Sequence, residues 1–258
     1  MRRPRALMTA AAASLTLAAV AVGGFPVTAA AAEPTEDRSG QTVAPEIEPR
    51  LIEEPDPDHD CGETGEYQEE VEQILDTLGD YGTVFVDGEQ SVQDCAAIKK
   101  FQKRMGIEPD AGYAGPVTKG IGDRLVETAL EDCDAASKGK TVCVDLTHQT
   151  LWVVDSDGER LTDPTVTRTG MKGYATTPGT HEINVREEKH WSNPYDVWLP
   201  YWQHFHDGEG LHETTTYLHD ESIGSHGCVN LLPSDAEELY GLLDYNDTVE
   251  VFGKRPGT

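Results

Sequence analysis

The stretch TVCVDLTHQTLWVV, residues 141–154, decides the fold of the larger part of the chain. Apolar residues alternate with polar ones at Val142, Val144 and Leu146, and again at Leu151 and Val153, which is the period of a strand with one buried face. Further short strand-like segments carry Val166, Ile183, Val185, Val197, Leu199, Val249 and Val251. We therefore predict that residues 140–254 form a mainly β domain, either a sandwich or a partly open barrel.

A single helix is expected within this β domain. Ser234 and Glu237 have the spacing of an N-terminal capping box. Helically spaced apolar residues accompany them, namely Ala236, Leu239, Tyr240, Leu242 and Leu243.

The region before it, residues 61–132, is predicted to be helical and small. An amphipathic pattern that ends near Gly79 forms the first helix, and Ser91–Met105 forms the second. Pro116 fits the first turn of a third helix. With Asp/Gly turns between them, the expected fold is a small three-helix bundle that precedes the β domain. Helical spacing is carried by Tyr67, Val71, Ile74, Leu75, Leu78, Cys95, Ile98, Phe101, Met105, Ile121, Leu125 and Val126.

The order VDG, CAAIKKFQKRMGI and DAGYAGPVT in this region resembles the three-helix peptidoglycan-binding domain of cell-wall enzymes. The resemblance covers about 70 residues and departs from the family pattern at Glu89-Gln90, where a glycine-containing turn is usual. It implies the glycan of peptidoglycan as a partner of residues 61–132. The alternative is a helical spacer without a ligand.

The chain begins with the pattern of an export signal. Arg2, Arg3 and Arg5 precede the apolar run Ala6–Val22, and small residues follow up to Ala32. We interpret residues 1–32 as a signal peptide cleaved near Ala30–Ala32, so that the protein works in the cell wall or outside the cell. A retained membrane anchor is the alternative. Residues 33–60, rich in Pro, Glu and Asp, are predicted to be a disordered acidic linker.

The formal net charge is −27 over 258 residues. So acidic a surface repels nucleic acid and anionic lipid, and we expect neither nucleic acid nor a membrane as a partner.

Five cysteines are present, and outside the membrane paired cysteines become disulfides. Pairs Cys61–Cys95 and Cys133–Cys143 would each stay within one compact region, and we favour them. Cys61–Cys133, which would tie the two ends of one small domain, is the main rival. Either choice leaves Cys228 as a free thiol.

Cys228 lies in the stretch Ser225-His226-Gly227-Cys228-Val229-Asn230. A thiol attacks a carbonyl as the thiolate, and an imidazole is the usual activator. His226 would share a face with Cys228 in an extended strand, whereas His212, sixteen positions upstream, could be brought opposite Cys228 by a strand–loop–strand return. Gly227 would let substrate backbone approach closely.

This stretch resembles the YkuD-type L,D-transpeptidase domain, whose signature is a histidine, a variable loop, [S/T]HGC, an apolar residue and Asn or Arg. The resemblance covers about 110 residues, including CVDLTHQTLWVVDSDGE and TTPGTHEI. It implies Cys228 as nucleophile and His212 as general base, with the ring of His212 oriented by the carbonyl of Glu213. Because the interval from His212 to Ser225 is short, His206 and His204 stay alternative bases. The substrate side of the site would comprise Ser225, His226, Gly227 and Asn230.

The implied reaction is acyl transfer without a cofactor or metal. Cys228 would attack the carbonyl before D-Ala in a peptidoglycan stem tetrapeptide, amides near Gly227 and Cys228 would hold the oxyanion, and an amine of another stem would resolve the thioester into a 3→3 cross-link. An imidazolium at His212 would lower the thiol pKa of Cys228. Carbapenem-type β-lactams are expected covalent inhibitors. The donor cleft would be lined by Tyr195, Trp198, Tyr201 and Trp202.

Three other functions stay open. An L,D-carboxypeptidase would use the same donor, with water as acceptor. A non-catalytic wall-binding protein would have lost the chemistry. A zinc enzyme would draw ligands from Cys228 and several histidines, although their spacings match no zinc motif. The histidines concerned are His204, His206, His212, His219 and His226.

Overall fold

The computed structural model describes residues 61, 63–214 and 216–258, all of which belong to one compact unit. The predicted signal peptide and acidic linker, residues 1–60, lie outside the described residues. Within the described part of the chain, no helix is long and apolar enough to cross a membrane.

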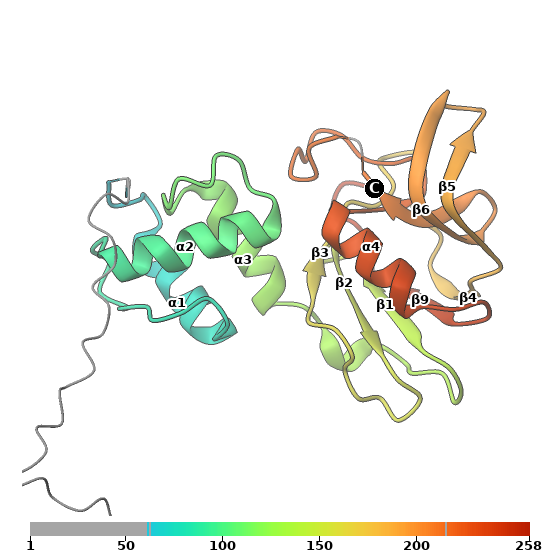
Figure 1. Ribbon diagram of the computed structural model, residues 1–258, viewed down its shortest axis with the longest axis horizontal. Coiled ribbons are helices and arrows are strands. Elements are labelled where there is room, and N and C mark those ends of the chain that lie inside the picture. The colour runs from blue at the N-terminus through green and yellow to red at the C-terminus, as the bar shows by residue number, and fades with distance from the viewer. Residues whose placement is uncertain (1–60, 62, 215) are drawn as a thin grey trace, which may run out of the picture. The chain divides into compact units, whose positions relative to one another are not determined.

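Three helices occupy the first part of this unit (Figure 1): α1 (Gln68–Leu78), α2 (Val92–Met105) and α3 (Pro116–Val126). The first two end at left-handed glycines, Gly79 and Gly106. Ser91 caps α2, because its side chain accepts the amide of Asp94 while Asp94 accepts the amide of Ser91. Pro116 stands at the start of α3. A short 3₁₀ turn, η1 (Leu130–Asp132), leads on to the β domain.

A buried glutamine on α2 ties two of these helices together. Gln102 is 2% exposed, and its amide nitrogen donates to Tyr113 O and to the hydroxyl of Thr118, each at 2.9 Å. Its carbonyl accepts the amide of Gly112 at 2.8 Å. The turn before α3 is therefore held against α2 by one side chain.

The β domain contains two sheets. One has the order β3-β2-β1-β9-β4 and the other β5-β6-β7-β8. Most neighbours are antiparallel, but β1 pairs with β9 and β7 with β8 in parallel. The strands are β1 (Thr141–Asp145), β2 (Thr150–Val154), β3 (Thr165–Val166), β4 (Gly179–Glu182), β5 (Val185–Ser192), β6 (Val197–His206), β7 (Glu209–Glu213), β8 (Val229–Leu231) and β9 (Thr248–Phe252).

The core of the domain joins both sheets with one helix, α4 (Pro233–Leu242). Val144 and Val251 of the first sheet, Leu211 and Val229 of the second, and Leu239 of α4 are all at most 2% exposed. The prediction of a mainly β domain with one helix is thus confirmed, and its sheets are mixed.

The predicted capping box of α4 is wrong. The N-cap is Leu232, Pro233 occupies the first turn, and no side chain caps the helix. A proline in the first turn has no amide to be satisfied, so the helix can begin one residue before Ser234.

Both favoured disulfides are present, Cys61–Cys95 and Cys133–Cys143. The rival pair Cys61–Cys133 is therefore wrong. Cys228 is the one free cysteine among the described residues.

Candidate active site

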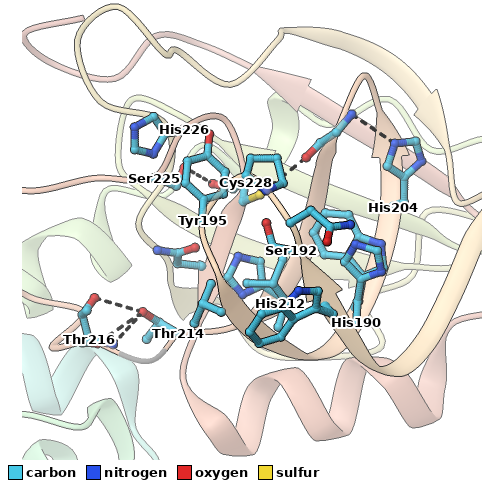
Figure 2. A pocket seen from close by; sticks show the side chains of 18 of the residues that line it. His190, Ser192, Tyr195, His204, His212, Thr214, Thr216, Ser225, His226 and Cys228 are labelled. Carbon is cyan, nitrogen blue, oxygen red and sulfur yellow. Dashed lines mark hydrogen bonds between the residues drawn. The ribbon is translucent and has the colours of Figure 1, made fainter.

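A cavity of about 810 Å³ opens between the β5–β6 hairpin and the loop that leads into β8. Cys228 and His212 both line it, as do Ser225, His226 and Asn230. Figure 2 shows Cys228, Tyr195 and His212 gathered near the centre of this pocket, with His226 and His204 to either side. The sequence-predicted site is thus one place in the fold.

Cys228 sits at the end of a tight turn immediately before β8. Gly227 has φ +115°, and a Cβ there would meet Glu209 Cγ at 2.9 Å, so only glycine fits. The hydroxyl of Ser225 accepts the amide of Gly227 at 3.1 Å and donates to Cys228 O at 2.5 Å. This turn fixes the position of the thiol relative to the strand.

Two details of the turn differ from expectation. His226 and Cys228 do not share a strand face, because β8 begins only at Val229 and Gly227 turns the chain between them. The Gly227 amide is already bonded to Ser225, so it is not a free oxyanion donor. The amide of Cys228 has no acceptor among the described hydrogen bonds and is left as the donor at this position.

His212 reaches the cavity through the parallel pairing of β7 with β8. It stands opposite Asn230 in that register, while Leu211 and Val229 face the core on the other side. His212 is 7% exposed, and its Nδ1 lies 2.7 Å from the carbonyl oxygen of Glu213. Because a carbonyl only accepts, Nδ1 carries the proton and Nε2 is the free base nitrogen.

Burial sets the charge of both groups. The pKa of the Cys228 thiol is raised to about 11, chiefly by burial, against the Gly210 amide and with a smaller contribution from the Glu209 carboxylate. Burial also lowers the pKa of His212 to about 4, against the bond to the Glu213 carbonyl. Both shifts act against the expected thiolate–imidazolium pair. Near neutral pH, thiol and imidazole are both uncharged.

An aromatic wall supports His212. Its ring lies 5.9 Å from that of Trp202, and Trp202 stacks on His190 at 5.0 Å, centroid to centroid. Gly210 allows this arrangement, because a Cβ there would meet the Trp202 ring at 2.6 Å. The glycine two residues before His212 thus makes room for the aromatic wall behind that histidine.

The predicted cleft aromatics divide into two groups. Tyr195 and Trp202 line the cavity, but Trp198 and Tyr201 do not. Trp198 is 46% exposed against Trp191, and Tyr201 packs on the hydrophobic core. The reason is a positive φ of +55° at Tyr201, which exchanges the two faces of β6.

The other histidines differ in their relation to the cavity. His204 lines it and bonds Asn184 Oδ1 at 2.6 Å, whereas His206 lies against His181 outside the lining. His226 is on the rim between Tyr174 and Tyr195. Among the described residues, no three His, Cys, Asp or Glu side chains are grouped so that they could hold a metal ion.

Comparison with known proteins gives the family of this site. The family described as the L,D-transpeptidase catalytic domain (YkuD) matches residues 139–251. A crystal structure of an L,D-transpeptidase from Stackebrandtia nassauensis is 64% identical, with a TM-score of 0.76, over 78% of this chain and 98% of that one. The chain belongs to the L,D-transpeptidase family. It is accordingly an acyltransferase of peptidoglycan cross-linking.

More distant structures share only part of the chain. An L,D-transpeptidase from Enterococcus faecium is 27% identical over 45% of this chain and 50% of that one, with a TM-score of 0.38. An LD transpeptidase in complex with imipenem is 19% identical over 44% and 59%, with a TM-score of 0.40. A search of curated proteins found no match.

Sequence reasoning missed two residues that shape this transpeptidase site. Glu209, 8% exposed, accepts the amide of Thr177 at 3.0 Å and its hydroxyl at 2.8 Å, which ties the segment before β4 to the turn at Gly227. Arg168, 4% exposed, lines the cavity and bonds the main chain of Tyr217. Arg168 directly follows the strand-like run TVT. This position in the sequence could have identified it as a buried arginine.

Proposed function

We propose that Cys228 is the nucleophile of this L,D-transpeptidase and that His212 is its general base. The observation that carries the proposal is the bond from His212 Nδ1 to the Glu213 carbonyl, because it leaves Nε2 able to accept a proton in the cavity that holds the free thiol. Other histidines are weaker candidates, since His206 lies outside the lining and His204 bonds Asn184.

The reaction starts from the neutral pair. As the sulfur of Cys228 attacks the carbonyl carbon before D-Ala, the thiol proton passes to Nε2 of His212, and the carbonyl becomes an oxyanion. The amide of Cys228 is placed to donate to it. The tetrahedral adduct collapses to a thioester while His212 returns its proton to the amine of the departing D-Ala.

The second half-reaction uses the same groups in reverse. A side-chain amine of another stem attacks the thioester, His212 takes a proton from that amine, and the thiol of Cys228 recovers a proton as the 3→3 cross-link forms. Tyr195 and Trp202 provide apolar walls for the stems in a cavity of about 810 Å³. Ser225 supports the turn, while His226 and Asn230 stand on the substrate side.

The experiment that tests this function gives a purified tetrapeptide muropeptide to the protein and separates the products by mass spectrometry. A cross-linked dimer together with free D-Ala is the expected result. Tripeptide and D-Ala without dimer, under excess acceptor, would instead establish the L,D-carboxypeptidase reaction. If wild type forms neither product, both proposed reactions are contradicted.

We further propose that residues 61–132 bind the glycan of peptidoglycan. Support comes from the FQ motif, in which Gln102 holds the turn at Gly112 to α2, and from apolar side chains left in solvent on this part, Phe85 at 48% and Tyr113 at 41% exposure. Sedimentation with purified sacculi tests it in a Cys228→Ala background. Phe85→Ala and Tyr113→Ala together should lower the bound fraction, and an unchanged fraction would favour a spacer.

Export and inhibition complete the proposal. Residues 1–32 fit a secretory signal, which is consistent with two disulfides in the described residues. Carbapenems should acylate Cys228, since a solved relative is an imipenem complex. Mapping the N-terminus of the secreted protein near Ala30–Ala32 tests the first point, and a mass increase of the intact protein in imipenem tests the second.

A further inference from the structure

A second cavity, of about 300 Å³, lies beside the catalytic one. Arg124 of α3 lines it, together with Arg255 near the end of the chain and Glu221 in the loop between β7 and β8. Arg168 lines both cavities and so forms part of the wall between them. Three arginines thus line a small space in a protein whose net charge is −27.

None of the three arginines has a carboxylate partner among the described residues. Arg124 donates to His148 O at 2.8 Å and to Thr167 O at 3.0 Å, and Arg255 donates to Ile223 O at 3.1 Å. Arg168 bonds the main chain of Tyr217. Neutral carbonyls satisfy N–H donors but do not cancel charge. The arginines that do form ion pairs in the described part are Arg104, Arg160 and Arg186.

One N–H donor among these arginines is also left without an acceptor. Arg168 is 4% exposed, yet its Nε has no acceptor among the described atoms. Burial lowers the pKa of Arg124 to about 10, the Glu221 carboxylate opposes this shift and Arg255 adds to it, and the group stays cationic at neutral pH. A buried cation and an orphaned N–H together are costly until an anion meets them. Glu221, an exposed side chain, is the one carboxylate in the lining.

We propose that the cavity lined by Arg124, Arg168 and Arg255 binds a small oxyanion, a carboxylate or a phosphate, at a site distinct from the catalytic cavity. Guanidinium forks match the paired oxygens of these groups. The volume accommodates one such anion with a few waters, each of which occupies about 30 Å³. The bound anion would lie next to Arg168, which also lines the catalytic cavity.

Calorimetric titration of the full chain with inorganic phosphate, and separately with acetate, tests the site at constant ionic strength. Saturable 1:1 binding of at least one anion, with Kd of about 1 mM or tighter, is expected. The two arms tell phosphate from carboxylate recognition. Cys228→Ala should bind equally well, which separates this site from the proposed chemistry. Absence of saturable binding of either anion by wild type would overturn the proposal.

Variants decide whether the cavity is the site. Arg255→Gln and Arg124→Gln should each weaken binding about tenfold or more, while the matched control Arg160→Gln, at an exposed pair with Asp163, should bind as wild type does. Equal weakening in Arg160→Gln would overturn the assignment, because it would indicate general charge screening.

Glu221→Gln keeps the test decisive if an arginine variant does not fold. The Glu221 side chain makes no hydrogen bond among those described, and its main-chain carbonyl, which Arg255 bonds at 3.5 Å, is retained. Removing this negative charge from the lining should tighten anion binding by roughly threefold to fivefold. Unchanged or weaker binding in this variant would contradict a site inside the cavity.

Discussion

At the scale of single residues, the proposed chemistry starts from a neutral thiol at Cys228 and a neutral imidazole at His212. His212 accepts a proton only while it is uncharged, and burial holds its pKa at about 4. The Cys228 thiol ionises by itself only near its pKa of about 11. Between these values, acylation needs the base and does not need a preformed thiolate.

The first prediction is the pH dependence of acylation by a carbapenem, measured as a stopped-flow rate. Wild type should be nearly level from about pH 5.5 to 9 and fall as pH drops through about 4, because His212 then becomes protonated. His212→Ala should be roughly 100- to 10,000-fold slower near neutrality and should recover about tenfold per pH unit toward pH 11 as the thiol ionises.

His206→Ala is the matched control, since His206 lies outside the cavity lining, and it should keep the wild-type profile. A wild-type rate that rises with a midpoint near pH 8.5, as for an ordinary thiol, would contradict the neutral pair.

The second prediction concerns the residue after the base. Of Glu213, it is the main-chain carbonyl that bonds the ring of His212, at 2.7 Å, so the side chain of Glu213 is expected to be dispensable. Glu213→Ala should keep the acylation rate within about threefold of wild type, while His212→Ala does not. A Glu213→Ala variant as slow as His212→Ala would show that the carboxylate takes part.

At this scale, the sequence predicted the features that depend on neighbouring residues in the chain. SHGC placed the free thiol next to a glycine, and the structure shows why the glycine is needed: φ at Gly227 is +115°. The sequence did not indicate the pKa shifts of His212 and Cys228, because burial is a property of the whole cavity. The sequence also could not show that Trp198 lies outside the cavity, since no local signal predicts a positive φ at Tyr201.

At the scale of elements, alternation predicted β1, β2 and β9, whose alternate apolar residues pack in the main core. The expectation of a single buried face was wrong for β1 and β2, because Cys143, Trp152 and Val154 are buried on the other side. The three helices of residues 61–132 followed from their apolar spacing, and Ser91, predicted as the first residue of the second helix, is its N-cap. The parallel pairing of β7 with β8 was not predictable, because a connection of fifteen residues, 214–228, separates them and leaves register to tertiary packing.

The third prediction concerns the tie between α2 and α3. Gln102→Leu leaves the Gly112 amide and the Tyr113 carbonyl without their partner in a buried place, and should lower the free energy of unfolding by about 2–3 kcal/mol. Gln73→Leu is the control: Gln73 is on α1, and its amide bonds only the exposed Glu69. It should cost less than about 0.5 kcal/mol in the same urea titration. Equal losses would show that the hydrogen bonds of Gln102 stabilise the fold no more than those of a surface residue do.

At the scale of the whole molecule, the helices and the β domain share contacts. One hydrophobic cluster contains Phe101 and Ile121 of the helices together with Val166 and Leu232 of the β domain. Arg104 of α2 also pairs with the buried Asp235 of α4 at 2.9 Å. The sequence divided the chain into two domains but gave no sign of these contacts, because they join residues that lie far apart in the sequence.

The fourth prediction tests this junction. Arg104→Met leaves the carboxylate of Asp235, 3% exposed, with Thr165 as its remaining hydrogen-bond donor. Because Arg104 is itself 38% exposed, the loss is expected to be about 1–3 kcal/mol of unfolding free energy, below that of a fully buried pair. Arg160→Met, which breaks an exposed pair with Asp163, should cost less than about 1 kcal/mol. Identical effects in the two variants would show that the junction adds nothing to stability.

The residue that carries the acyl group decides whether Cys228 is the nucleophile. The protein is mixed with a stem tetrapeptide donor without acceptor, quenched in acid within seconds, digested and analysed by mass spectrometry. We predict one adduct, equal in mass to the donor acyl group without D-Ala, on the peptide that contains Cys228, and none in Cys228→Ala. An adduct on any other residue, or D-Ala release by Cys228→Ala at the wild-type rate, would contradict the account.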